Sequence, residues 1–152
     1  MRPTSDRVRE AWMSILQLEI PDARVLDLFA GSGALGIEAL SRGARSADFV
    51  DLSAKSLKVL QANLMILQAG GDAAIHMADA LKFIAGLPPL AYDVAFADPP
   101  YAQGFAEAVA SQWLKVPFAR VIGVEHEKKV ELPESTDRRV YGDTVVTIYR
   151  TS

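Results

Sequence analysis

The segment Asp27–Gly36 constrains the fold of this chain more than any other part of the sequence, because an apolar run leads directly into closely spaced glycines. The run Val25–Phe29 is nearly continuously apolar, as expected of a strand that is covered on both faces. Gly31, Gly33 and Gly36 follow it with the spacing G-x-G-x-x-G, and a helical pattern comes next. Glycine permits a tight backbone turn and lets a bound group approach without meeting a Cβ atom. The segment therefore predicts a strand–turn–helix unit that can hold a cofactor.

The same alternation of strand and helix patterns continues along most of the chain. Helices are predicted near 6–18, 34–41, 54–67, 81–85 and 105–114, and strands near 25–29, 47–50, 73–77, 93–97 and 121–124. After Pro133 the pattern changes to two short strands, 136–141 and 144–149, joined by Gly142 and Asp143. Five strand–helix units closed by a hairpin predict an α/β, Rossmann-like domain. Its sheet would be open and mostly parallel, with helices on both faces and an antiparallel C-terminal hairpin.

Length and composition narrow the class of protein. The chain has 152 residues, of which half are hydrophobic and 23% charged, with no cysteine and a net charge of -3 at pH 7. A chain of about 150 residues suits one core, so we expect a single domain over 1–152. The lack of cysteine excludes a disulfide scaffold, a thiolate metal site and a cysteine nucleophile. No apolar run approaches the roughly 20 residues that span a bilayer, and the start does not resemble a signal peptide. We therefore expect a cytoplasmic protein without a membrane segment.

Four aspartates mark the ends of successive predicted strands. Asp27 lies near the end of the first strand, and Asp51 closes the second. Asp79 and Asp98 follow the third and fourth strands. The carboxyl ends of parallel strands meet at one edge of the sheet, where ligands bind, so the set predicts a binding site. Each aspartate also has a structural explanation as a helix N-cap, and for Asp79 taken alone that explanation is the better one.

The glycine spacing alone fits nicotinamide dinucleotides, flavins and S-adenosylmethionine. The four aspartates at the strand ends discriminate between these cofactors. A pyrophosphate favours the N–H groups of a helix N-terminus and would be repelled by neighbouring carboxylates. S-adenosylmethionine has no phosphate and presents a sulfonium, an ammonium, a ribose diol and an adenine amine, all suited to acceptor groups. S-adenosylmethionine is therefore the predicted cofactor, with Asp51 placed for the ribose hydroxyls. The predicted cofactor-binding residues are Asp27, Phe29, Ala30, Gly31, Ser32, Gly33, Gly36, Asp51, Leu52, Asp79, Ala80 and Asp98.

The tetrad Asp98-Pro99-Pro100-Tyr101 is the predicted catalytic segment, because it follows the apolar run 94–97 at the same sheet edge. An exocyclic amine on a base is a poor nucleophile, since its lone pair is delocalised into the ring. The Asp98 carboxylate and the Pro99 carbonyl can accept its two N–H bonds and turn the lone pair toward a methyl group. The prolines fix φ and remove competing donors, and Tyr101 offers a flat face for the base. Such a reaction needs positioning and electrostatics rather than a histidine base.

The order DLFAGSG, VD, DA and DPPY resembles the class I S-adenosylmethionine-dependent methyltransferases that act on amino groups. More narrowly, the opening sequence RPTSDRVREA of residues 2–11 resembles the opening signature of the bacterial small-subunit (16S) rRNA guanine-N2 methyltransferases, the RsmD-like family. Asn63, the segment Val124–His126 and the pattern R-x-Y-G-D-T of residues 139–144 match the same family. The resemblance extends over essentially the whole chain.

The resemblance implies a seven-stranded sheet of order 3-2-1-4-5-7-6 with an antiparallel seventh strand. It also implies that Asp98 and Pro99 orient a guanine N2 amine in small-subunit rRNA, free or in a partly assembled subunit. Arg2, Arg7 and Arg9 would face the RNA backbone from the first helix. Family members usually carry a basic, glycine-containing segment ahead of the opening signature, whereas this sequence starts at the signature. We expect this difference to affect RNA docking and to leave the cofactor site intact.

Two other functions fit parts of the pattern. DPPY also occurs in DNA adenine-N6 methyltransferases, but such enzymes need elements that read and open a duplex, and this chain has no spare length for them. A non-catalytic nucleotide-binding module would keep the glycines and would have no need for residues 98–101. We further expect a monomer. No metal site is expected, because the two histidines are far apart in sequence. His126, Trp12 and Trp113 are predicted to be structural residues.

Overall fold

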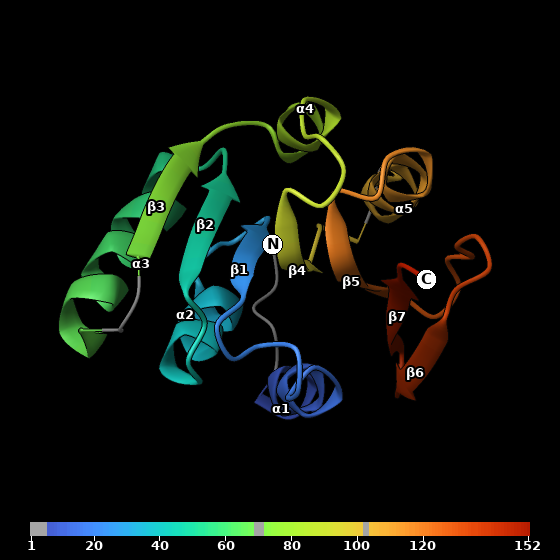
Figure 1. Ribbon diagram of the computed structural model, residues 1–152, viewed down its shortest axis with the longest axis horizontal. Helices are drawn as coiled ribbons and strands as arrows, with labels where there is room; N and C mark the ends of the chain where they lie inside the picture. The colour runs from blue at the N-terminus through green and yellow to red at the C-terminus, as the bar shows by residue number, and fades with distance from the viewer. Residues whose placement is uncertain (1–5, 69–71, 102–103) are drawn as a thin grey trace.

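The computed structural model describes residues 6–68, 72–101 and 104–152. Helices and strands alternate from α1 to β5, and a hairpin closes the chain (Figure 1). The helices are α1 (Asp6–Ile15), α2 (Ala34–Ser41), α3 (Ala54–Leu67), α4 (Ala80–Ala85) and α5 (Phe105–Lys115). The strands are β1 (Arg24–Leu28), β2 (Ser46–Asp51), β3 (Asp72–Met77), β4 (Tyr92–Ala97), β5 (Ala119–Glu127), β6 (Asp137–Tyr141) and β7 (Thr144–Arg150).

All seven strands form one sheet of order β3-β2-β1-β4-β5-β7-β6. The pairs β1·β2, β1·β4, β2·β3 and β4·β5 are parallel, whereas β7 runs antiparallel to both β5 and β6. This arrangement confirms the predicted sheet order and the antiparallel hairpin. Because β1 lies between β2 and β4, the carboxyl ends of these three strands are neighbours at one edge of the sheet.

Two hydrophobic clusters cover the two faces of the sheet. Side chains of α1, α2 and α3 pack on one face, and side chains of α4 and α5 pack on the other (Figure 1). On the first face, Trp12 of α1 is fully buried and meets Phe96 of β4 edge to face, with ring centroids 5.2 Å apart. A Cβ atom at Gly123 would lie 2.1 Å from the Trp12 ring, so this glycine lets α1 pack directly on β5.

The structure departs from the sequence expectations mainly at element ends. The first helix ends at Ile15 rather than near residue 18, and Leu18 is 89% exposed. Strand β5 continues to Glu127, beyond the apolar run 121–124, because β7 pairs with it along its whole polar end. Thr4 and Ser5, which could cap the first helix, and Gly70 and Gly71, which could end the third, lie outside the described residues.

Candidate functional site

The turn between β1 and α2 has the backbone geometry expected of the glycine pattern. Gly31 and Gly33 adopt φ values of 56° and 83°, in the left-handed region that glycine enters without strain. Phe29 also has a positive φ of 57°, which is unusual for a bulky residue. Strained backbone of this kind is concentrated at functional sites. The Ala30 N–H donates to the carbonyl of Val50 at 3.0 Å, which joins the turn to β2.

Two of the three glycines are required by packing inside the protein, which the sequence interpretation did not foresee. A Cβ atom at Gly33 would lie 2.2 Å from Cδ1 of Leu60. A Cβ atom at Gly36 would lie 2.4 Å from Cε1 of Phe49. The spacing therefore allows α2 to pack closely on β2 and α3, whether or not a cofactor approaches the turn.

Asp27 is a buried carboxylate beneath the turn. Its side chain is 2% exposed, and Oδ2 accepts a hydrogen bond from the Gly36 N–H at 3.0 Å. Burial raises the pKa of the Asp27 carboxyl well above its usual range, and the charges of Asp98 and Asp51 raise it further against the opposing Gly36 bond. A cation placed beside Asp27 would stabilise its ionised form, so the site is suited to a positively charged ligand.

Asp51, at the end of β2, connects the glycine turn to the start of α3. Its Oδ2 accepts from the Gly31 N–H and its Oδ1 from the Ser53 N–H, each at 2.8 Å. Each carboxylate oxygen has a second lone pair, so these bonds orient the group and leave it able to accept from a ligand hydroxyl. The next residue, Leu52, is 65% exposed and gives this edge an apolar surface.

Asp79 acts as the N-cap of α4. Its Oδ1 accepts from the Leu81 N–H at 2.9 Å and the Lys82 N–H at 3.4 Å. The structural explanation weighed for Asp79 alone is therefore correct, and its cofactor contact stays a prediction. Ala80 is buried at the first position of α4.

The glycine turn is also joined to α3, because the Ser32 carbonyl accepts from Nδ2 of Asn63 at 3.0 Å.

The tetrad begins directly after β4. Asp98 is 9% exposed and Pro99 is buried, while Pro100 and Tyr101 are half-buried. The hydroxyl of Tyr101 lies 2.7 Å from Oγ1 of Thr144 on β7. Asp98 lies close enough to Asp27 for its charge to raise the pKa of the Asp27 carboxyl, and it directly precedes Pro99.

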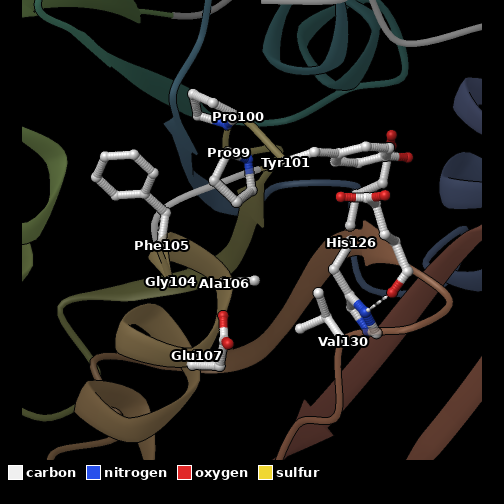
Figure 2. Close-up of a pocket in the computed structure, with 11 residues that line it drawn as sticks. Pro99, Pro100, Tyr101, Gly104, Phe105, Ala106, Glu107, His126 and Val130 are labelled. Carbon is white, nitrogen blue, oxygen red and sulfur yellow. Dashed lines mark hydrogen bonds between the residues drawn. The ribbon is translucent and has the colours of Figure 1, made fainter.

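A pocket of about 180 Å³ opens beside the tetrad (Figure 2). The segment after β4, the start of α5 and the end of β5 form its walls. Its lining residues are Pro99, Pro100, Tyr101, Gly104, Phe105, Ala106, Glu107, Glu125, His126, Glu127 and Val130. The sequence interpretation included the tetrad and missed the rest, because the α5 and β5 residues meet the tetrad only in the folded sheet. Three glutamates among them give the pocket an acceptor-rich lining.

The residues predicted to be structural have that role. Nδ1 of His126 donates to the Glu127 carbonyl at 2.9 Å, so Nε2 accepts from the Thr147 hydroxyl at 2.7 Å. Burial lowers the pKa of this imidazole, which keeps it neutral near pH 7. Trp12 donates from Nε1 to Oε1 of Glu125 at 3.3 Å, and Trp113 donates to the carbonyl of Ala119 at 2.9 Å.

Two of the three predicted RNA-contacting arginines are described. The guanidinium carbon of Arg7 lies 5.7 Å from the ring centroid of Tyr141, an arrangement that favours a cation–π contact. Arg9 pairs with Asp6 at 2.9 Å on the surface of α1. Arg2 lies outside the described residues. Both described arginines are on the helix that packs over β5, and their contact with RNA stays a prediction.

Neither a metal site nor a membrane span is found in the parts of the chain that the structure describes. In these parts, no group of three or more histidine, aspartate or glutamate side chains could hold a metal ion. Likewise, no helix within residues 6–68, 72–101 and 104–152 is both long and apolar enough to cross a bilayer.

Comparison with known families decides the classification. The family model described as Conserved hypothetical protein 95 matches residues 1–150. The chain belongs to this family. It is 35% identical over 160 residues to the putative rRNA methyltransferase YlbH of Bacillus subtilis, covering 98% of this chain and 87% of that protein. It is 43% identical over 109 residues to the ribosomal RNA small subunit methyltransferase D of Escherichia coli, covering 70% of this chain and 53% of that protein.

A solved structure similar to this chain has the same fold. The putative methyltransferase YhhF from Escherichia coli superposes with a TM-score of 0.83 at 33% identity, covering 99% of this chain and 87% of that one. The seven-stranded sheet is thus the class I methyltransferase fold, as the resemblance implied.

Proposed function

We propose that this protein transfers a methyl group from S-adenosylmethionine to the N2 amine of a guanine in small-subunit rRNA, with residues 1–152 acting as one catalytic domain. The position of Asp98 carries this proposal. Asp98 is 9% exposed, its charge helps to raise the pKa of Asp27, and it directly precedes Pro99 in the wall of the pocket. A carboxylate at that position can hold an amine at the boundary between a cationic cofactor and a base.

The residues at the ends of β1 and β2 fit S-adenosylmethionine by their chemistry. Asp27 is a buried carboxylate whose pKa is raised by burial, so a cationic group would be a favourable neighbour. Asp51 has lone pairs for ribose hydroxyls, and Leu52 offers exposed apolar surface for an adenine ring. When bound, the cofactor would supply a methyl group activated by its sulfonium.

The tetrad residues would prepare the amine for attack. The Asp98 carboxylate and the Pro99 carbonyl accept its two N–H bonds, which leaves the nitrogen lone pair pointing toward the methyl carbon. Methyl transfer from the bound donor would form a C–N bond and break the C–S bond, whose electron pair would stay on sulfur. The extra proton on nitrogen leaves afterwards to Asp98 or to water, so no imidazole base is needed. The neutral, fully bonded His126 agrees with this mechanism.

The lining of the pocket supports guanine as the target base. Guanine presents N–H donors at N1 and N2 along one edge, whereas adenine presents an acceptor at N1. Glu107, Glu125 and Glu127 supply acceptors to the pocket, and Tyr101 supplies a stacking surface. The relatives named for rRNA methylation support ribosomal RNA as the source of the base. Arg7 and Arg9 on α1 are the proposed contacts to the RNA backbone.

The decisive experiment offers the protein and labelled S-adenosylmethionine three substrates: deproteinised rRNA, partly assembled small subunits and duplex DNA. The modified nucleoside is then identified by mass spectrometry. We expect N2-methylguanine from one of the two RNA substrates. N6-methyladenine from the duplex would replace this proposal with DNA methylation, and no labelled product from any substrate would favour a non-catalytic binding module.

A further inference from the structure

The hydrogen bond between Tyr101 and Thr144 joins the tetrad to the C-terminal hairpin. The two hydroxyl oxygens are 2.7 Å apart, and the residues are separated by 43 positions in sequence. In the sheet, β5 lies between β4, which leads into Tyr101, and β7, which begins at Thr144. The side-chain bond therefore crosses the end of β5, beside the pocket.

The backbone of Thr144 is fixed on both sides. It pairs with Glu127 of β5 and with Tyr141 of β6. The turn before it depends on Gly142, whose φ is 63°, and the Lys128 N–H donates to the Asp143 carbonyl at 2.9 Å. A β-branched side chain on such a strand has few χ1 rotamers. The backbone pairing and the few rotamers restrict where the Thr144 hydroxyl lies before any substrate arrives.

Tyr101 gains orientation from this bond. The two prolines before it restrict the backbone, but they leave the side-chain torsions of the tyrosine to be set by its surroundings. The bond to Thr144 fixes the hydroxyl end of the ring, and the ring lines the pocket (Figure 2). A ring that is already oriented loses less entropy when a base stacks on it.

We infer that Thr144 is a positioning residue for methyl transfer, which holds the Tyr101 ring in the orientation that receives the target base. The inference rests on the proposed function, and it gives Thr144 no catalytic contact of its own. It predicts that the Thr144 hydroxyl and the Tyr101 hydroxyl act as one unit, so that the loss of either has the effect of losing both.

The test compares Thr144→Val, Tyr101→Phe, the double variant and Thr144→Ser in methyl transfer to the RNA substrate. We expect Thr144→Val and Tyr101→Phe each to lower kcat/KM for RNA by about fivefold, the equivalent of one ordinary hydrogen bond. The double variant should show no further loss, because both substitutions break the same bond. Thr144→Ser keeps the hydroxyl and should recover most of the activity. Cofactor affinity, measured by calorimetry, should stay unchanged throughout.

Thr136→Val is the matched control, because it removes a threonine hydroxyl that accepts from the Arg150 N–H at 3.0 Å in the same hairpin, away from the pocket. It should leave methyl transfer unchanged. Full activity in Thr144→Val, or equal losses in Thr136→Val and Thr144→Val, would overturn the positioning role. Chemical unfolding of Thr144→Val, Tyr101→Phe, the double variant and Thr144→Ser measures how much the bond contributes to the free energy of unfolding. If the wild-type protein transfers no methyl group, the proposed function and the positioning role both fail, even where unfolding still shows the two hydroxyls to be coupled.

Discussion

The two halves of the site are built in different ways. At the ends of β1 and β2, carboxylates accept bonds from backbone N–H groups, as Asp27 does from Gly36 and Asp51 does from Gly31. At the ends of β4 and β5, side chains meet side chains over long separations, as Tyr101 does with Thr144 and Trp12 does with Glu125. These two bonds join residues 9 and 20 positions apart, so both carboxylates are positioned once β1, the glycine turn and β2 have formed. The pocket beside β4 and β5 (the pocket half) needs the complete sheet, unlike the ends of β1 and β2 (the cofactor half). Substitutions in one half should therefore change either methyl transfer or cofactor affinity, and not both.

The largest expected effect comes from Asp98→Ala. The substitution removes the acceptor proposed to orient the amine, and methyl transfer should fall about 100- to 1,000-fold, as it does when one transition-state contact is deleted from an active site. Calorimetry should show little change in affinity for S-adenosylmethionine. Asp93→Asn, near the other end of β4, alters an ion pair with Arg24 and should leave methyl transfer intact. Unchanged turnover in Asp98→Ala would remove Asp98 from the mechanism.

Asp27→Asn should act on the cofactor half. Removing the charge should weaken binding of the cationic cofactor about 10- to 100-fold, the range expected for a charged contact. Asp48→Asn, in β2 and bonded to the Tyr92 hydroxyl at 2.5 Å, is the control and should leave that affinity unchanged. Equal affinity in Asp27→Asn and the wild type would show that the cation lies elsewhere.

The same substitution has a pH signature in the cofactor-free protein. The folded pKa of Asp27 is raised above its unfolded value by burial, so the folded state holds the proton more tightly. Its contribution to stability is fully present below the unfolded pKa and is lost as the pH rises through the folded pKa. Asp27→Asn should therefore unfold at a higher temperature than the wild type at pH 7, and the difference should shrink toward pH 4. A lower unfolding temperature at pH 7 would contradict a carboxyl whose pKa is raised by burial.

Gly36→Ala tests the packing explanation of the glycine pattern. The added Cβ atom would approach Phe49 to 2.4 Å and Oδ2 of Asp27 to 3.1 Å, so the core must shift. We expect a loss of about 1–3 kcal/mol in the free energy of unfolding. Gly86→Ala is the control, because a Cβ atom there meets its nearest neighbour at 3.9 Å. Equal stability of the two variants would exclude the packing explanation and leave cofactor approach as the reason for Gly36.

The smallest effect is expected at Asp79. Asp79→Ser keeps an N-cap oxygen for α4 and removes the carboxylate, so the free energy of unfolding should stay within about 0.5 kcal/mol of the wild type. If Asp79 contacts the cofactor, affinity should fall about fivefold. Ser53→Ala, which removes the cap of α3, should lose about 1 kcal/mol of stability with no change in affinity. An unchanged affinity in Asp79→Ser would make Asp79 a helix cap only.

The sequence predicted the fold well because the relevant signals are local. The apolar runs at 25–29 and 94–97 each indicate one strand, and the family resemblance supplied the strand order. The length of β5 was missed, because its polar end depends on pairing with β7. The tetrad was found as a contiguous motif. Thr144 and Glu125 were given no role, because their partners lie 43 and 113 positions away.

The place of β7 in the sheet has a consequence for the newly made chain. β6 pairs with β7, and β7 alone joins it to β5, although β6 precedes β7 in sequence. On the ribosome, β6 therefore emerges without its partner, and the edge of β5 stays open until residues 144–150 follow. By then β1, β2 and β4 have already been available to form the cofactor half. Under the proposed function, a partly synthesised chain would have the residues for the methyl donor before it has the complete pocket for the base, and the pairing of β7 would complete the catalytic site.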